Sequence, residues 1–316
     1  MTKHPIRFGF QSGQQNVTWE RMRDAWQKLD GWGYDSLWVF DHLYPIFVPD
    51  PAGPCMENWT LLGALSQHTK RARIGALVNG NTYRNPCLTA KMAATLDHLS
   101  GGRLNLGLGA GWFELEHRSF GIDFKTVGGR LGALDESCQI IKGMFTQERT
   151  TLNGKHYNVV DAVCNPKPLQ KPHIPLMIGG RGEKGLLKIV AKHADMWNTM
   201  HANPDEMKRL IGVIERHGDT VGRNTDEIEK TIMMPLCYRA PKQREDMIAG
   251  TVASTARISP AQARDRIMIG GKQECLDKIE QYTKAGVTHF IFSLRWPILI
   301  EDEFQAFAEE VIPAVR

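Results

Sequence analysis

The stretch that decides the fold is Arg103-Leu-Asn-Leu-Gly-Leu-Gly-Ala-Gly-Trp-Phe-Glu-Leu-Glu-His117. From Leu104 to Leu108 a leucine occupies every second position, which is the pattern of a β-strand with one bulky and one small face. Glycine weakens a strand, so the spaced residues Gly107, Gly109 and Gly111 indicate that something approaches the backbone closely. Two interpretations stay open: the strand end forms the wall of a ligand cavity, or tight packing inside a barrel imposes the glycines.

Apolar segments of strand length recur on both sides of this stretch, and helical patterns follow them. The expected strands are residues 7–10, 36–40, 74–78, 104–108, 176–178, 196–198, 228–238 and 289–294. The expected helices are residues 18–32, 59–69, 86–99, 130–146, 182–194, 205–217, 274–285 and 303–315. Alternating strands and helices predict a parallel sheet. Eight such units in about 300 residues favour a TIM (β/α)8 barrel with loop insertions over a doubly wound sheet, as a single domain over residues 1–316.

Three stretches do not fit the simple alternation, and we expect them to shape a pocket: Tyr44–Asn58, Thr150–Pro168 and Arg239–Gly270. Tyr44–Asn58 is a loop too long for a plain connector. Residues 151–158 predict a hairpin, because Asn153-Gly154 is a favoured two-residue turn. Residues 241–271 are polar and helical, with no clear register.

Composition narrows the class of protein. The hydrophobic fraction of 42% and the charged fraction of 23% are those of a soluble globular chain. A net charge of +4 without runs of like charge gives no support for nucleic-acid or membrane binding. The six cysteines lack zinc or C-x-x-C spacing, which predicts free thiols in a reducing cytoplasm and no metal site. Residues 1–5 contain no apolar signal-peptide core, so we expect a cytoplasmic protein.

In a TIM barrel the chemistry lies at the carboxyl ends of the strands. Asp41 and His42 directly follow the expected strand 36–40. Two interpretations stay open for them: a general acid/base pair, or a polar pair that closes the barrel rim. A histidine that titrates near neutrality suits proton transfer beside a redox cofactor. Trp59 and Trp112 fall near loops, where a flat side chain could line a planar ring.

Glu114, Glu116 and His117 contain a Glu-x-x-His spacing that can ligate a di-iron centre. A di-iron site needs a second copy on a four-helix framework, which the sequence lacks. We therefore interpret these residues as rim charges and as first-turn acids of the next helix.

Gly180-Arg-Gly-Glu-Lys-Gly185 matches G-x-G-x-x-G after a strand and before a helix. Backbone N–H groups at such a helix start can hold a phosphate in a barrel. A dinucleotide-binding Rossmann unit and a plain helix entry are the alternatives. Asp195 comes too early to be the ribose-binding acid of a Rossmann unit.

Several short motifs occur together and in order along the chain. They are Val39-Phe-Asp-His-Leu43, Thr82-Tyr-Arg-Asn-Pro86, Ala93-Ala-Thr-Leu-Asp-His-Leu-Ser-Gly-Gly-Arg103, Leu106-Gly-Leu-Gly-Ala-Gly-Trp112 with Glu114 and His117, Pro175-Leu-Met-Ile-Gly-Gly180 and Ala194-Asp-Met-Trp-Asn198. Together they resemble the bacterial-luciferase-like superfamily, and in particular its coenzyme-F420-dependent branch. The resemblance is weakest between Arg239 and Gly270.

The resemblance implies a homodimeric TIM barrel with a flavin or deazaflavin at its mouth. It places the ring against a bulge in the third strand, often at a non-prolyl cis peptide, near Leu77-Val78. It implies His42 as the catalytic residue for proton transfer or for stabilising the reduced ring. The cofactor-binding residues implied by the resemblance and by the strand ends are Asp41, His42, Leu77, Val78, Asn79, Gly109, Ala110, Gly111, Trp112, Gly179, Gly180, Arg181 and Gly182.

The resemblance predicts an oxidoreductase that exchanges hydride between coenzyme F420 and a small organic substrate. The alternative is an FMN-dependent monooxygenase that receives reduced flavin from a separate reductase and captures O₂. A non-catalytic flavin-binding protein is a third hypothesis. Sugar-phosphate dehydrogenases of the branch carry a catalytic glutamate where this chain has Trp112, which argues against sugar-6-phosphate oxidation. Arg181, Lys184 and Lys188 are candidates for binding the polyglutamate tail of F420.

Overall fold

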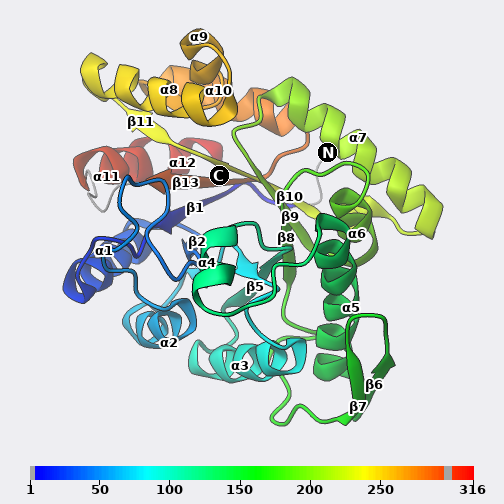
Figure 1. Ribbon diagram of the computed structural model, residues 1–316. Helices are drawn as coiled ribbons and strands as arrows, with labels where there is room; N and C mark the ends of the chain where they lie inside the picture. The colour runs from blue at the N-terminus through cyan, green and yellow to red at the C-terminus, as the bar shows by residue number, and fades with distance from the viewer. Residues whose placement is uncertain (1–3, 295–300) are drawn as a thin grey trace.

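Parallel strands close into a barrel in the computed structural model, which describes residues 4–294 and 301–316 (Figure 1). Residues 1–3, which begin the stretch considered for a signal peptide, lie outside the described part. Within it, eight strands pair in the order of a TIM barrel, and β3 pairs with β5 to close the ring. The strands are β1 (Arg7–Ser12), β2 (Ser36–Val39), β3 (Arg73–Ala76) continued by β4 (Asn79–Gly80), β5 (Leu104–Gly109), β8 (Leu176–Gly179), β9 (Met196–Met200), β10 (Glu229–Met234) and β13 (His289–Leu294). The predicted fold is confirmed.

Helices surround the barrel, as Figure 1 shows. They are α1 (Trp19–Trp32), α2 (Asn58–His68), α3 (Pro86–Leu99), α4 (Glu114–Ser119), α5 (Val127–Thr146), α6 (Leu186–His193), α7 (Pro204–Val221), α8 (Lys242–Ala256), α9 (Pro260–Arg264), α10 (Lys272–Lys284), α11 (Glu301–Glu310) and α12 (Ile312–Val315). Local sequence explains their ends. Thr18 caps α1 and Gly33 ends it in the left-handed conformation, as predicted. Asn203 and Glu206 form a capping box at the start of α7.

The hairpin predicted around Asn153-Gly154 is present, but its turn is different. Strands β6 (Thr150–Asn153) and β7 (Asn158–Ala162) are joined by the four residues 154–157 instead of a two-residue turn. The carboxylate of Glu136 on α5 accepts hydrogen bonds from the backbone N–H groups of residues 155, 156 and 157. A tertiary contact from a helix therefore overrides the local turn preference.

The strand predicted over residues 228–238 is interrupted. Pro235 cannot donate a backbone hydrogen bond, and β10 ends just before it. The chain then leaves the barrel as β11 (Leu236–Tyr238), which pairs with β12 (Met268–Gly270). Between them α8 and α9 form a small cluster of their own around Cys237 and Ile248, in the region where the sequence pattern had no clear register.

The described part of the chain contains no helix long and apolar enough to cross a membrane. All six cysteines are free thiols, as the sequence predicts.

Side chains fill the barrel in two layers. An apolar layer includes Trp38, Met177 and Ile291. Below it, at the amino ends of the strands, Arg7 donates two hydrogen bonds of 3.0 and 3.1 Å to the Glu229 carboxylate, and His289 Nδ1 lies 3.6 Å from Glu229. Burial raises the pKa of Glu229, but contacts with His289 and Arg7 outweigh it and lower the pKa to about 2.

Replacing Glu229 by Gln should lower the free energy of unfolding at pH 7 by about 3 kcal/mol, because Arg7 and His289 lose their buried anion. A depressed carboxyl pKa stabilises the fold above the unfolded pKa of about 4.3 and ceases to do so as pH falls toward 2. The variant should therefore lose less stability than the parent between pH 4.5 and 2. Denaturant unfolding across this range measures both effects. Glu280→Gln, at an exposed ion pair with Lys284, is the control and should change stability by less than about 0.5 kcal/mol.

Candidate functional site

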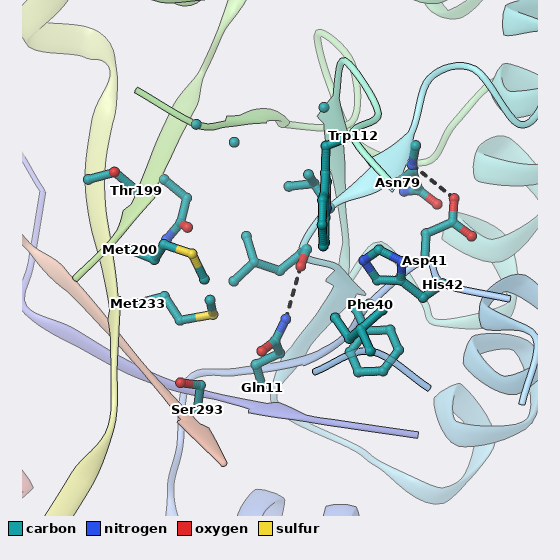
Figure 2. Close-up of a pocket in the computed structure, with 18 of the residues that line it drawn as sticks. Gln11, Phe40, Asp41, His42, Asn79, Trp112, Thr199, Met200, Met233 and Ser293 are labelled. Atoms are coloured by element: carbon teal, nitrogen blue, oxygen red, sulfur yellow. Dashed lines mark hydrogen bonds between the residues drawn. The ribbon is translucent and has the colours of Figure 1, made fainter. Parts of the chain in front are cut away.

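A cavity of about 870 Å³ opens at the carboxyl ends of the barrel strands (Figure 2). All but one of the residues implied as cofactor-binding line this cavity. They are Asp41, His42, Leu77, Val78, Asn79, Gly109, Ala110, Gly111, Trp112, Gly179, Gly180 and Arg181. Gly182 is the exception, because it is exposed in the loop that follows β8. The structure thus brings residues from four separate stretches of sequence around one space.

The third strand bulges where the resemblance implied. The peptide bond between Leu77 and Val78 is cis, and it separates β3 from β4. Leu77 N–H donates to the Val39 carbonyl at 2.8 Å, and the Leu77 carbonyl accepts from Gln11 Nε2 at 3.0 Å. On the far side, Asn79 Nδ2 donates to the Gly107 carbonyl at 2.8 Å. The bulge is therefore held from both sides and forms part of the cavity wall.

The glycines of β5 and β8 are required by this bulge. A Cβ on Gly107 would lie 2.1 Å from the Ala76 carbonyl oxygen. A Cβ on Gly109 would lie 2.7 Å from Val78 Cγ2, and one on Gly179 would lie 2.9 Å from Val78 Cγ1. Both interpretations of the glycine strand therefore hold: the glycines allow close packing, and what they pack against is the wall of a cavity.

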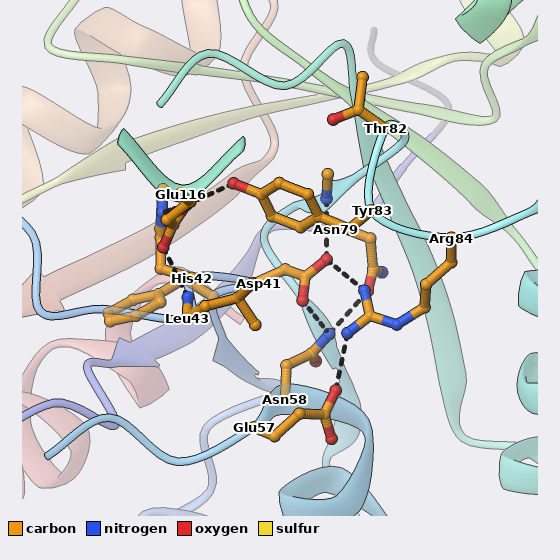
Figure 3. Close-up of polar contacts among 12 residues, drawn as sticks. Asp41, His42, Leu43, Glu57, Asn58, Asn79, Thr82, Tyr83, Arg84 and Glu116 are labelled. Carbon is orange, nitrogen blue, oxygen red and sulfur yellow. Dashed lines mark hydrogen bonds and ion pairs between the residues drawn. The ribbon is translucent and has the colours of Figure 1, made fainter. Parts of the chain in front are cut away.

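The Asp41 carboxylate connects three segments under the rim (Figure 3). It accepts hydrogen bonds from Arg84 Nη1 at 2.8 Å, Asn58 Nδ2 at 3.1 Å and the Gly80 N–H at 2.9 Å. Arg84 also reaches Glu57 at 2.7 Å. The Asp41 carboxylate is buried, and its hydrogen bonds occupy both oxygens. The geometry therefore favours the interpretation of Asp41 as part of a polar cluster that closes the rim, and it disfavours the acid/base role.

His42 is held by Glu116, a contact that the sequence analysis missed. His42 Nδ1 lies 3.0 Å from Glu116 Oε2, and the phenol of Tyr83 donates to the same oxygen. The other oxygen accepts from the N–H groups of Leu43 and Tyr44 at 2.6 and 3.1 Å. Figure 3 shows these groups converging on one carboxylate.

The interpretation of Glu116 and His117 as rim charges is wrong, since both are fully buried, whereas Glu114 is exposed. Burial raises the pKa of Glu116, but hydrogen bonds from His42, Tyr83 and Leu43 outweigh it and hold the pKa below its usual value. Burial, followed by the contact with Glu116, raises the pKa of Tyr83. Tyr83 is therefore a neutral donor and Glu116 an ionised acceptor.

Because an ionised carboxylate can only accept hydrogen bonds, Nδ1 of His42 carries the proton in this pair. Nε2 is then the ring nitrogen left for the cavity. Aromatic rings fix the imidazole plane: Phe40 and Trp112 pack edge-on at 5.4 and 5.5 Å. Trp112 itself is 54% exposed. Trp59, by contrast, is buried in the core and lies outside the cavity lining, so the prediction that it lines a planar ring is wrong.

The G-x-G-x-x-G stretch forms the loop between β8 and α6. Gly180 has φ of +128°, and a Cβ there would lie 2.5 Å from Leu186 Cδ2. Helix α6 begins at Leu186 instead of residue 182, because the loop uses the intervening residues to turn. The strand belongs to a closed barrel, which rules out a Rossmann unit.

A family model described as luciferase-like monooxygenase matches residues 1–249. The chain belongs to this family. A relative from Microbacterium testaceum (strain StLB037), named F420-dependent glucose-6-phosphate dehydrogenase, is 25% identical over 99% of this chain and 98% of that protein.

Two solved structures share the family barrel. An F420-dependent secondary alcohol dehydrogenase in complex with an F420-acetone adduct superposes with a TM-score of 0.85 at 21% identity, covering 99% of this chain and all of that one. The oxygenating constituent of 3,6-diketocamphane monooxygenase from Pseudomonas putida, in complex with FMN, superposes with a TM-score of 0.73 at 16% identity. This match covers 98% of this chain and 99% of that one. At these identities the likeness shows the fold.

Several residues of this luciferase-like site were missed at the sequence level. Gln11 and Asn198 were not among them, because both stand at carboxyl ends of strands, where the sequence predicts the chemistry, and both line the cavity. Tyr83 and Arg84 lie in a motif that carried the family resemblance. Met200 and Met233 line the cavity with no signal in the sequence, because methionine is common in any core.

Gly109→Ala should destabilise the fold by about 1–3 kcal/mol, because its methyl group would collide with Val78. Adding Val78→Ala should restore part of the loss by emptying the same space. Denaturant unfolding of the single and double variants measures this. Gly63→Ala on α2, where a Cβ meets nothing within 4 Å, is the matched control and should be neutral or stabilising. Equal losses for Gly109→Ala with and without Val78→Ala would contradict the packing argument.

Proposed function

We propose that this protein is an oxidoreductase that exchanges hydride between coenzyme F420 and a small organic substrate. The observation that carries the proposal is the His42–Glu116 pair, which aims an imidazole nitrogen into a cavity beside the Leu77-Val78 bulge. The name of the Microbacterium relative, which aligns with nearly the whole chain, supports F420 as the cofactor.

The residues present fit a deazaflavin. The cavity volume of about 870 Å³ lies within the range of sites that hold a cofactor and a small substrate. Leu77, Val78 and Asn79 would support the ring, with Gly109–Trp112 as the neighbouring wall. Gly179–Gly182 would hold the phosphate with backbone N–H groups, and exposed Arg181, Lys184 and Lys188 would attract the anionic tail. When bound, F420 supplies the hydride acceptor or donor.

His42 would move the proton that accompanies the hydride. In the oxidative direction, Nε2 accepts the proton of a substrate hydroxyl while the carbon-bound hydrogen leaves as hydride. Glu116 would stabilise the resulting imidazolium through Nδ1, because the carboxylate is already ionised and buried. Trp112 replaces the glutamate that the sugar-phosphate dehydrogenases of the branch carry, so we propose a substrate other than a sugar 6-phosphate.

FMN is the alternative cofactor. The ring support and the phosphate loop would serve a flavin equally well, and the family description as luciferase-like monooxygenase supports this alternative. An FMN enzyme of this kind would need a separate flavin reductase and O₂.

The setting of the enzyme is also a proposal. We propose a single domain over residues 1–316 that acts in the cytoplasm as a homodimer. Free thiols at all six cysteines support a reducing compartment. The resemblance to luciferase-like enzymes supports the dimer.

The proposal is tested first by fluorescence titration of the purified protein with F420 and, in parallel, with FMN. We expect F420 to bind tightly and FMN weakly, because only F420 offers a polyglutamate tail to Arg181, Lys184 and Lys188. The reverse preference would assign the protein to the two-component monooxygenases. If neither cofactor binds, the assignment of the ring site is wrong.

His42→Ala should keep the F420 dissociation constant within a few fold and lower kcat by roughly 10²–10⁴-fold, because proton transfer loses its positioned group. Steady-state turnover and the binding titration separate the two effects. His68→Ala, an exposed histidine near the end of α2, is the control and should retain full turnover. Unchanged turnover in His42→Ala would remove His42 from the mechanism.

A further inference from the structure

Two large aromatic rings stand side by side at the cavity. Phe47 and Trp112 are stacked, with ring centroids 5.9 Å apart and planes 19° from parallel. Both line the cavity, and both are 54% exposed. Exposed apolar surface of this size within a concave site commonly marks a place where an apolar ligand binds.

The chain holds both rings in place. The side-chain amide of Gln15 donates to the Ile46 carbonyl at 3.1 Å and accepts from the Ile46 N–H at 2.8 Å. Phe47 follows directly in the left-handed conformation, with φ of +59°. Trp112 packs edge-on against His42 at 5.5 Å. A substrate whose oxygen reaches His42 therefore lies against Trp112.

The wall across the cavity carries two further apolar side chains beside polar ones. Figure 2 shows Met200 and Met233 across the cavity from His42, next to Thr199 and Ser293. Methionine side chains are flexible and adapt to apolar groups of different shapes. Thr255 and Ala256, from the end of α8, also line the cavity.

Charge is scarce in the part of the cavity outside the phosphate loop. Among the described residues that line it, Arg181 is the only lysine or arginine, and it follows β8 next to the phosphate loop. Among the same described lining residues Asp41 is the only acidic one, and it forms an ion pair with Arg84. A phosphorylated substrate needs cations of its own, and the described lining offers none away from Arg181.

We propose that the compartment between Phe47, Trp112, Met200 and Met233 binds an uncharged alcohol, or the corresponding ketone, that carries a hydrocarbon ring next to the reacting carbon. This inference rests on the proposed F420-dependent function. In oxidation, the carbinol C–H bond breaks and its electron pair leaves with the hydrogen as hydride to oxidised F420. The hydroxyl proton passes to His42 Nε2 and the C=O double bond forms. Reduction of the ketone by reduced F420 is the reverse.

The test compares kcat/KM for three alcohols with F420, and for the ketones of the two secondary alcohols, acetophenone and acetone, with reduced F420. The alcohols are 1-phenylethanol, propan-2-ol and glucose 6-phosphate, which reacts at its anomeric carbon. We expect 1-phenylethanol or its ketone to be preferred over propan-2-ol or acetone by tenfold or more, and glucose 6-phosphate to be inactive. Higher kcat/KM for glucose 6-phosphate or for propan-2-ol than for 1-phenylethanol would overturn the inference.

Phe47→Ala should reduce the preference for 1-phenylethanol over propan-2-ol by about tenfold, mainly through KM, because a stacked ring is lost. Val160→Ala, an exposed apolar residue on the β6–β7 hairpin outside the cavity lining, is the control and should leave the preference unchanged. An unaltered preference in Phe47→Ala would remove the aromatic pair from substrate recognition.

The F420 titration is run on the same samples and separates the two levels of the argument. If F420 does not bind, the proposed function fails. If F420 binds and is turned over only with polar or phosphorylated alcohols, the function stands and the substrate inference fails.

Discussion

The packing of one side chain, Val78, links three strands of the cavity wall. Its two methyl groups occupy the space that Cβ atoms on Gly109 and Gly179 would need. Because barrel strands are hydrogen-bonded along their length, the third strand can bulge inward only if its neighbours provide room. Two strands, β5 and β8, supply that room by carrying glycine at the facing positions. The cavity wall is therefore a property of three strands together.

Two buried carboxylates then fix the groups around this bulge. Asp41 joins β4, α2 and Arg84, so the loop that follows the third strand has a defined height at the rim. Glu116 joins α4 to His42 and to the backbone after it. Burying a carboxylate costs free energy unless hydrogen bonds satisfy it. Both are satisfied by several donors, which makes them rigid supports for the segment that carries His42.

The sequence predicted the barrel and twelve of the residues that line its cavity, because these depend on periodic patterns and strand ends. It did not predict contacts between distant segments. The carboxylate of Glu136 binds the backbone of the loop after Asn153, including the N–H group of His156, which lies 20 residues away in the chain. This loop takes the place of the favoured two-residue turn at Asn153-Gly154. Glu116 lies 74 residues from His42, so its pattern alone suggested a rim charge. In each case a carboxylate acts on a backbone segment that local propensity does not connect to it.

Under the proposed function, position 112 separates the choice of substrate from the binding of the cofactor. The bulge lies between β3 and β4, the loop that would hold the phosphate follows β8, and residues of both line the cavity. Trp112 lies beyond the end of β5 and directly follows Gly111, which has φ of +80° and turns the chain at the cavity. A residue there projects toward His42 without taking part in barrel packing, as the 5.5 Å ring contact shows. A carboxylate at this point would supply a second acid or base, whereas an indole supplies an apolar wall. If the proposed function holds, exchange of this one side chain would change the substrate pocket between polar and apolar, while the glycines and buried carboxylates beneath it stay unchanged.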